Sequence, residues 1–258
     1  MNSVSAGPEL ELRIACGAML YDASRMDQPG SDGFERDHWR QRGVLEEVAG
    51  GRGTVAFIHD GDRRWVLRHY RRGGLVARFL DDTYLYTGEA RTRAHAEFRL
   101  LRRLREWNLP VPVPVAARYQ RAGLVYRADL LTEELPTRLT LAQALASGPL
   151  EPVTWRAIGR CIAGLHARGV QHADLNAHNL LLGAGGEVYV LDFDRGRIRA
   201  RGAWEDRVLT RLRRSLDKVT SGVPSGHFGD AEWQWLLDGV AGVNGGDGIG
   251  GVSSVSGG

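Results

Sequence analysis

The sequence contains almost no lysine. Its 34 basic residues include a single lysine, Lys218, so all the others are arginine. A coding bias toward GC-rich codons would produce this composition without any functional cause. The consequence for chemistry is the same in either case, because arginine binds phosphate and carboxylate with a planar fork but does not deprotonate to act as a base. Any site in this chain that needs a cation must therefore use arginine.

Long apolar runs and clustered cysteines are also missing. There is no apolar stretch of about 18 residues, so we expect no transmembrane helix. The first residues, MNSVSAGPELELRIACG, carry acids and lack the basic start and apolar core of a signal peptide. Cys16 and Cys161 lie far apart and form no metal-binding pattern, which favours reduced cysteines in the cytosol.

The chain of 258 residues, with 43% hydrophobic and 25% charged residues, is typical of a soluble globular protein. It is long enough for one large domain or for two lobes that share a cleft. We expect residues 1–33 to form a partly irregular N-terminal extension, because they are mixed in character and contain turn signals such as QPGSDG. Residues 239–258 are dominated by glycine and serine, which predicts a disordered tail.

Residues 34–134 read as a β-rich N-terminal lobe. Two apolar runs flank HDGD, which predicts a β-hairpin over residues 54–70, and three glycines precede its first strand. Residues 90–106 have helical spacing, with Phe98, Leu101 and Leu104 along one face. The prolines that follow force an extended segment, and residues 122–131 read as a strand before the connector at 132–138.

Residues 135–238 read as a short, mainly helical C-terminal lobe. Residues 139–148 and 152–169 predict two helices, and the second carries an apolar stripe of Trp155, Ile158, Ile162 and Leu165 before it ends at Gly169. Residues 180–193 read as strand, glycine-rich turn and strand, and a basic helical segment spans about 203–218. The whole order predicts an α+β protein with two lobes.

Three polar residues stand out in the second lobe. Asp174 and Asn179 lie in HADLNAHNLLL, and Asp192 follows the apolar run VYVL. Transfer of a phosphoryl group from ATP needs metal ligands and a group that orients the acceptor hydroxyl. Asn179 and Asp192 have the oxygen ligands that Mg²⁺ prefers, and Asp174 is suited to accept the proton of a hydroxyl. As turn residues, Asp174 and Asn179 would need no such role.

HADLNAHN resembles the catalytic loop H-R-D-L-x-x-x-N of protein kinases, and LDFD resembles their D-F-G site. The resemblance implies a bilobal protein-kinase-like fold and assigns ATP contacts to Gly51, Gly53 and Arg68, the last paired with Glu97. Glu133, in the connector, completes the expected ATP-binding residues. Two alternatives remain open: the glycines could serve only as a hairpin entry, and Glu97 could pair with Arg93 or Arg102 on the surface. His172 is expected to support the loop backbone.

The departures from protein kinases narrow the family. Arg68 stands where a lysine is usual, Asp194 replaces the glycine of D-F-G, and Ala173 replaces the arginine beside the aspartate. There is no A-P-E motif, and its absence argues against a peptide substrate. From residue 34 to 236 the sequence is instead similar to the 3-deoxy-D-manno-octulosonic acid (Kdo) kinases. The stretches that carry this are VLRHYRRGG, LPVPVPVAA, YRADLLTEELP, HADLNAHNLLL, DFDRGRIR and RLRRSLDK.

This resemblance implies transfer of the ATP γ-phosphate to a Kdo hydroxyl on a lipid A precursor, with Mg²⁺, by a peripheral protein at the cytoplasmic face of the bacterial inner membrane. Arginines in segments that should border the cleft would suit an anionic acceptor and an anionic membrane surface, although each could equally lie on a solvated face; they are Arg68, Arg71, Arg72, Arg195, Arg197, Arg199, Arg211, Arg213 and Arg214.

Other functions fit part of the pattern. A heptose kinase, an aminoglycoside kinase or another small-molecule kinase would share the same catalytic residues. An inactive kinase-like binding module would fit Arg68 and the glycine loop, in which Ala56 stands where protein kinases usually have a third glycine. Such a module would not need Asp174, Asn179 and Asp192 together. No basic motif interleaved with aromatic residues points to nucleic acid.

Overall fold

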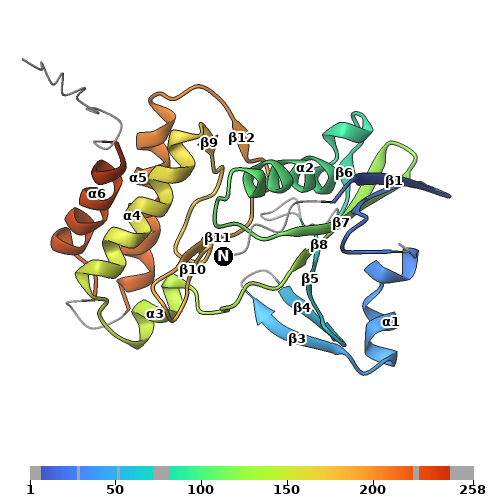
Figure 1. The fold of residues 1–258 in the computed structure, drawn as a ribbon, viewed down its shortest axis with the longest axis horizontal. Helices are drawn as coiled ribbons and strands as arrows, with labels where there is room; N and C mark the ends of the chain where they lie inside the picture. Colours follow the sequence, from blue (N-terminus) through green and yellow to red (C-terminus); the bar gives the residue numbers. More distant parts are fainter. Residues whose placement is uncertain (1–6, 28–29, 51–52, 72–81, 223–226, 245–258) are drawn as a thin grey trace, which may run out of the picture.

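The computed structural model describes residues 7–27, 30–50, 53–71, 82–222 and 227–244. In Figure 1 a sheet with helix α2 packed on it forms one part of the molecule, and helices α3 to α6 form the other. The two parts are joined in sequence after strand β8, where the chain enters α3. This is the α+β bilobal arrangement that the sequence predicts.

The described residues of the first lobe form an eight-stranded sheet with the order β1-β2-β7-β8-β5-β4-β3, and β6 pairs with β8. All of these pairings are antiparallel. The strands are β1 (Glu9–Ile14), β2 (Gly17–Asp22), β3 (Leu45–Gly50), β4 (Gly53–Asp60), β5 (Arg63–His69), β6 (Tyr84–Leu85), β7 (Pro114–Ala122) and β8 (Val125–Glu133).

The predicted hairpin around HDGD is present as β4 and β5. Asp60 pairs with Arg63, so the turn consists of Gly61 and Asp62. Gly61 has φ +61°, in the left-handed region that glycine enters without a steric cost. The hairpin places Arg68 near the end of β5, opposite Leu130 in the neighbouring strand β8.

The N-terminal region contributes more to the sheet than the sequence predicts. Strands β1 and β2 fall within the expected extension, yet β2 pairs with β7 along most of its length. Helix α1 (Arg36–Gln41) packs Trp39 edge-to-face on Trp65, with ring centroids 6.3 Å apart. Adjacent residues Leu130 and Leu131 belong to different buried clusters, because successive side chains in a strand point to opposite faces. The sheet therefore has a core on each face.

Helix α2 (Arg93–Glu106) matches the predicted helix over 90–106, except that a short 3-10 helix, η3 (Glu89–Arg91), forms its first residues. The predicted stripe of Phe98, Leu101 and Leu104 is fully buried. Because Glu97 lies next to this stripe, it is carried into the interior toward the second lobe.

The second lobe contains the predicted helices, the predicted hairpin of β10 and β11, and a further antiparallel pairing of β9 with β12. The apolar stripe from Trp155 to Leu165 in helix α4 is buried as expected. Its elements are α3 (Leu141–Ser147), α4 (Pro152–Ala167), β9 (Val170–Gln171), β10 (Leu180–Leu182), β11 (Val188–Val190), β12 (Arg197–Ile198), α5 (Trp204–Thr220) and α6 (Asp230–Asn244).

The prediction that the glycine-rich tail begins at residue 239 is wrong. Helix α6 continues through Gly239 to Asn244. A side chain at Gly239 would stand 2.2 Å from the carbonyl oxygen of Arg156, and one at Gly159 would stand 2.0 Å from that of Leu236. Gly239 is thus a close-packing residue between α4 and α6. Residues 245–258 of the expected tail lie outside the described residues.

No helix within the described ranges is long and apolar enough to cross a membrane.

Candidate active site

The segment 172–179 between β9 and β10, which we call the catalytic loop, is held by His172. The imidazole Nδ1 accepts a hydrogen bond of 3.1 Å from the backbone N–H of Asp174, and Nε2 donates one of 2.8 Å to the carbonyl of Leu191. These partners assign the proton of the neutral ring to Nε2. Burial lowers the pKa of His172 despite the opposing hydrogen bond to Leu191, which keeps the ring neutral. The prediction that His172 supports the loop backbone is confirmed.

Asn179 forms hydrogen bonds to Asp174 within the loop and to Leu191, which precedes Asp192. Its Nδ2 donates a hydrogen bond of 2.9 Å to the backbone carbonyl of Asp174, as does Nδ2 of Asn176. The backbone carbonyl of Asn179 accepts a hydrogen bond of 2.9 Å from the N–H of Leu191. Since Leu191 directly precedes Asp192, the structure brings all three predicted polar residues into one region.

Asp192 has an unusual backbone conformation, with φ +61°. An aspartate in the left-handed region costs ~1 kcal/mol, so the residues on either side must hold it there. Leu191 is fixed by His172, and the N–H of Phe193 donates a hydrogen bond of 3.1 Å to Oε1 of Glu97. The backbone at Asp192 is therefore pinned from both lobes.

The predicted ion pair between Arg68 and Glu97 is present. Nη2 of Arg68 contacts Oε2 of Glu97, and Nη1 contacts Oδ1 of Asp192. Tyr70 completes the group: its hydroxyl donates to Oε2 of Glu97 at 2.6 Å, and its ring lies 4.6 Å below the Arg68 guanidinium. Arg68 thus joins strand β5, helix α2 and the segment that carries Asp192.

The alternative surface partners of Glu97 are excluded. Arg93 contacts Asp194 instead, and Arg102 binds Asp22 with a distance of 3.0 Å. Glu97 itself is buried, with 3% of its side chain exposed. The contact with Arg93 also gives Asp194 a structural partner at the start of α2.

The pKa values of Glu97 and Asp192 shift in opposite directions. Burial raises the pKa of Glu97 and outweighs the lowering effect of Arg68. Burial raises the pKa of Asp192 as well, but the charge and hydrogen bond of Arg68 outweigh it, and the net pKa lies below its ordinary value. Asp192 is therefore ionised at neutral pH, as a ligand for a hard cation must be.

Arg211 of helix α5 contacts the Asp174 carboxylate. Its Nε lies 2.7 Å from Oδ1, and Nη2 contacts the same oxygen. One helical turn further on, the Ser215 hydroxyl accepts a hydrogen bond of 3.1 Å from the N–H of Ala177. Helix α5 therefore touches the catalytic loop at two points on one face.

The donor set fits Mg²⁺ in part. Asp192 supplies an ionised carboxylate, and the amide nitrogen of Asn179 is engaged by Asp174, which leaves its oxygen as the atom able to bind a cation. Mg²⁺ needs only one or two such side chains, because water and phosphate complete its octahedron. The two predicted ligands are therefore compatible with this metal.

The structure does not test the expected contacts of Gly51 and Gly53 with ATP. Gly51 lies outside the described residues, and Gly53 begins strand β4 directly after that gap. Glu133 ends strand β8, and Arg25 contacts its carboxylate. A contact between Glu133 and ATP stays a prediction.

The arginines predicted to border the cleft separate into distinct groups. Arg68 and Arg211 reach the residues described above, whereas Arg213 binds Asp217 and Asp230 away from the catalytic loop. The other described members of the group are exposed: Arg71, Arg195, Arg197, Arg199 and Arg214. Arg72 lies outside the described residues.

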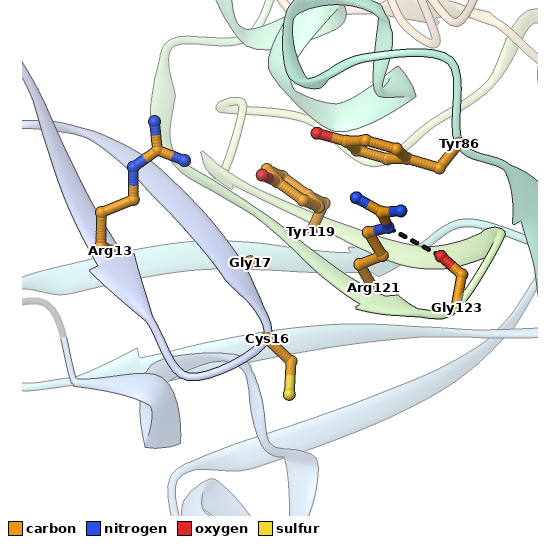
Figure 2. Close-up of a pocket in the computed structure, with 7 residues that line it drawn as sticks. All are labelled: Arg13, Cys16, Gly17, Tyr86, Tyr119, Arg121 and Gly123. Carbon is orange, nitrogen blue, oxygen red and sulfur yellow. Dashed lines mark hydrogen bonds between the residues drawn. The ribbon is translucent and has the colours of Figure 1, made fainter.

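A separate pocket of about 500 Å³ lies in the first lobe, and none of the site residues described above lines it. Figure 2 shows the ring of Tyr86 facing that of Tyr119, with Arg121 next to the two rings and Arg13 on the other side of Tyr119. The rings are stacked with centroids 5.7 Å apart. The Arg13 guanidinium is paired with Glu89, so its charge is already compensated.

Three features of the site were not predicted from the sequence: Tyr70, Ser215 and the contact of Arg211 with Asp174. The alternation of β5 offers a signal for Tyr70, because residues 68 and 70 face the same side of an extended chain. Ser215 and Arg211 carry no such signal, since they lie 38 and 37 residues from their loop partners.

Comparison with known proteins identifies related sequences. The model of the lipopolysaccharide kinase (Kdo/WaaP) family matches residues 36–239. A 3-deoxy-D-manno-octulosonic acid kinase of Stenotrophomonas maltophilia is 49% identical over 207 residues, which cover 79% of this chain and 81% of the relative. The proteins of the same name from Xanthomonas campestris pv. campestris and Xanthomonas oryzae pv. oryzae are 47% and 44% identical, the latter over 85% of this chain and 88% of the relative.

Proposed function

The chain belongs to the lipopolysaccharide kinase (Kdo/WaaP) family, and on this basis we propose that it transfers the γ-phosphate of ATP to a hydroxyl of Kdo on a lipid A precursor. The observation that carries the proposal is the connection between the two motifs. The N–H of Leu191 binds the carbonyl of Asn179, which fixes Asp192 beside the loop of Asp174. Phosphoryl transfer depends mainly on such positioning.

Asp174 is the base in the proposed reaction. The acceptor oxygen uses a lone pair to form a bond to the γ-phosphorus, and its proton passes to the Asp174 carboxylate. The bond between the γ-phosphorus and the β–γ bridging oxygen breaks, and its electron pair leaves with ADP. A carboxylate suits this role because it accepts the proton as the new bond forms.

The remaining residues bind ATP and metal. Asn179 and Asp192 would hold Mg²⁺, which supplies positive charge to the phosphate oxygens. Arg68, fixed by Glu97 and Tyr70, presents its guanidinium next to Asp192, where it is suited to contact phosphate. Gly51, Gly53 and Glu133 are proposed to complete the ATP site.

Release of ADP from ATP tests this function. We expect the release to require Mg²⁺ and to be stimulated by a Kdo-bearing lipid A precursor. Two other acceptors should give no stimulation: a heptose-containing core whose Kdo is already phosphorylated, and an aminoglycoside. If one of these other acceptors stimulated the release, it would replace Kdo as the proposed substrate. Absence of ATP binding would favour an inactive binding module.

We further propose a peripheral location at the cytoplasmic face of the inner membrane. Four residues of the segment from Arg195 to Arg199 are exposed: Arg195, Arg197, Ile198 (47%) and Arg199. Arg197 pairs in β12 with Gln171 of β9, the residue before His172, so this basic segment adjoins the catalytic loop. Arginines beside an exposed apolar side chain suit an anionic leaflet, at ~1 kcal/mol for each.

Vesicle sedimentation tests the location. The protein is expected to sediment with phosphatidylglycerol vesicles and to stay in solution with phosphatidylcholine alone. Arg197→Ala should weaken binding about fivefold, which corresponds to the loss of ~1 kcal/mol. Arg160→Ala, on the exposed side of α4, is the matched control and should bind as the wild type does. Equal sedimentation with both lipids would contradict the proposal.

A further inference from the structure

We propose that Arg211 is a positioning residue for the phosphoryl transfer, which holds the Asp174 carboxylate by Oδ1 so that Oδ2 faces the acceptor hydroxyl. The inference rests on the proposed function and assigns a role to a residue far from both motifs. It starts from the two contacts that the guanidinium makes with one oxygen, through Nε at 2.7 Å and through Nη2. Because both N–H groups bind Oδ1, that oxygen is occupied and anchored, and Oδ2 is left as the carboxylate oxygen able to accept the proton.

Helix α5 is rigidly placed for this task. Val208, Leu212 and Leu216 of the helix are buried in the main core, which sets its rotation about its own axis. Ser215 on the adjoining turn accepts the hydrogen bond from the Ala177 N–H, so the same face touches the catalytic loop twice. Side chains four residues apart in a helix lie one above the other, which explains why Arg211 and Ser215 reach the same loop.

The catalytic loop itself offers no cation. Its sequence HADLNAHN lacks arginine and lysine, and Asn176 binds the Asp174 backbone rather than its carboxylate. The Asp174 side chain is 29% exposed and that of Arg211 is 56% exposed. Without Arg211 the carboxylate could rotate toward solvent, and a carboxylate displaced by about 1 Å loses most of its effect on the reaction.

The neighbouring arginine shows that this contact is specific to position 211. Arg213 points toward α6, where it binds Asp230 at 2.9 Å and lies over the rings of Phe228 and Trp233. It is therefore a paired arginine on the same helix without contact to Asp174. This makes Arg213→Ala a matched control for the loss of an arginine from α5.

The test is a double-mutant cycle. Arg211→Ala, Arg211→Lys, Arg213→Ala, Asp174→Ala and the double variant Arg211→Ala/Asp174→Ala are compared in kcat, KM for ATP and thermal unfolding midpoint. We expect Arg211→Ala to lower kcat about 100-fold with KM for ATP and the midpoint unchanged. Arg211→Lys should lose less, because it keeps the charge and a single donating nitrogen in place of the fork. Arg213→Ala should keep the wild-type kcat. In the Asp174→Ala background, the removal of Arg211 should have no further effect on kcat.

Two results would overturn the proposal: a wild-type kcat in Arg211→Ala, or the same fold loss from Arg211→Ala with and without Asp174. If Arg211→Ala unfolds, a wild-type kcat in Arg211→Lys, whose shorter donor cannot reproduce the two contacts, has the same meaning. Failure of the proposed function looks different, because the wild type would then show no stimulation by the Kdo acceptor. In that case, the cycle is measured on ATP hydrolysis, in which water takes the place of the sugar hydroxyl.

Discussion

Asp174→Ala is expected to lower kcat about 1000-fold, which is within the range for loss of a general base. The fold should remain intact, because the catalytic loop is held through backbone groups: the N–H of Asp174 binds His172, and its carbonyl binds Asn179. The carboxylate is partly exposed, and within the part of the chain that the structure describes its one hydrogen-bonding partner is Arg211. Initial rates of acceptor-dependent ADP release, with thermal unfolding in parallel, measure both expectations.

Asp206→Ala is the matched control for this variant. Asp206 is an exposed carboxylate in the first turn of α5, the helix that carries Arg211. Its removal should leave kcat as in the wild type. If Asp174→Ala retained comparable activity, Asp174 would not be the base, and the kinase-like assignment of the loop would have to be abandoned.

Glu97→Gln is expected to reduce both stability and turnover. The two Glu97 oxygens accept only from donors: Oε1 from the Phe193 N–H, and Oε2 from Tyr70 and Arg68. A glutamine has one acceptor oxygen, so either orientation of the amide turns its NH₂ group toward a donor. We expect the free energy of unfolding to fall by about 3 kcal/mol. Turnover should fall as well, since Arg68 and the backbone at Asp192 lose a common anchor.

Glu106→Gln separates this effect from a general change of charge on α2. Glu106 is the last residue of the same helix and pairs with Arg103 at the surface. Such exposed pairs contribute about 0 to 1 kcal/mol, so its unfolding curve should nearly overlay that of the wild type. Urea unfolding of the two variants under the same conditions gives the comparison. Equal stability of Glu97→Gln and Glu106→Gln would show that the Arg68–Glu97 pair does not anchor the two lobes.

Some features of the fold followed from local sequence patterns. The helix stripes of α2 and α4 and the turn at Gly61 depend on residues within a few positions of one another, and each is confirmed. The N-terminal strands were missed for the opposite reason. β1 is exposed along nearly all of its length, so its sequence shows little burial pattern, and its place in the sheet depends on β2, which pairs with the distant β7.

The end of the second lobe shows the limit of composition as a guide. Gly239 opens a glycine-rich stretch in the sequence, which predicts a tail, yet it lies inside α6. Its role appears only when the backbone of Arg156 is brought to 2.2 Å from the place of a missing Cβ. Composition does not distinguish a glycine in a flexible segment from one at a tight contact between helices. The distinction depends on the packing of α6 against α4, which are distant in sequence.

The sequence by itself determined the family and predicted the polar residues of the proposed site. Asp174, Asn179 and Asp192 could be predicted from the sequence because phosphoryl transfer would need these residue types, and because their spacing lies within two short motifs. Only the tertiary structure decided which residues hold them in place. Glu97 binds Phe193 from 96 residues away, and Arg211 binds Asp174 from 37 residues away. Such contacts depend on how helices α2 and α5 pack against the rest of the protein, and that packing is set by apolar side chains spread over the whole chain.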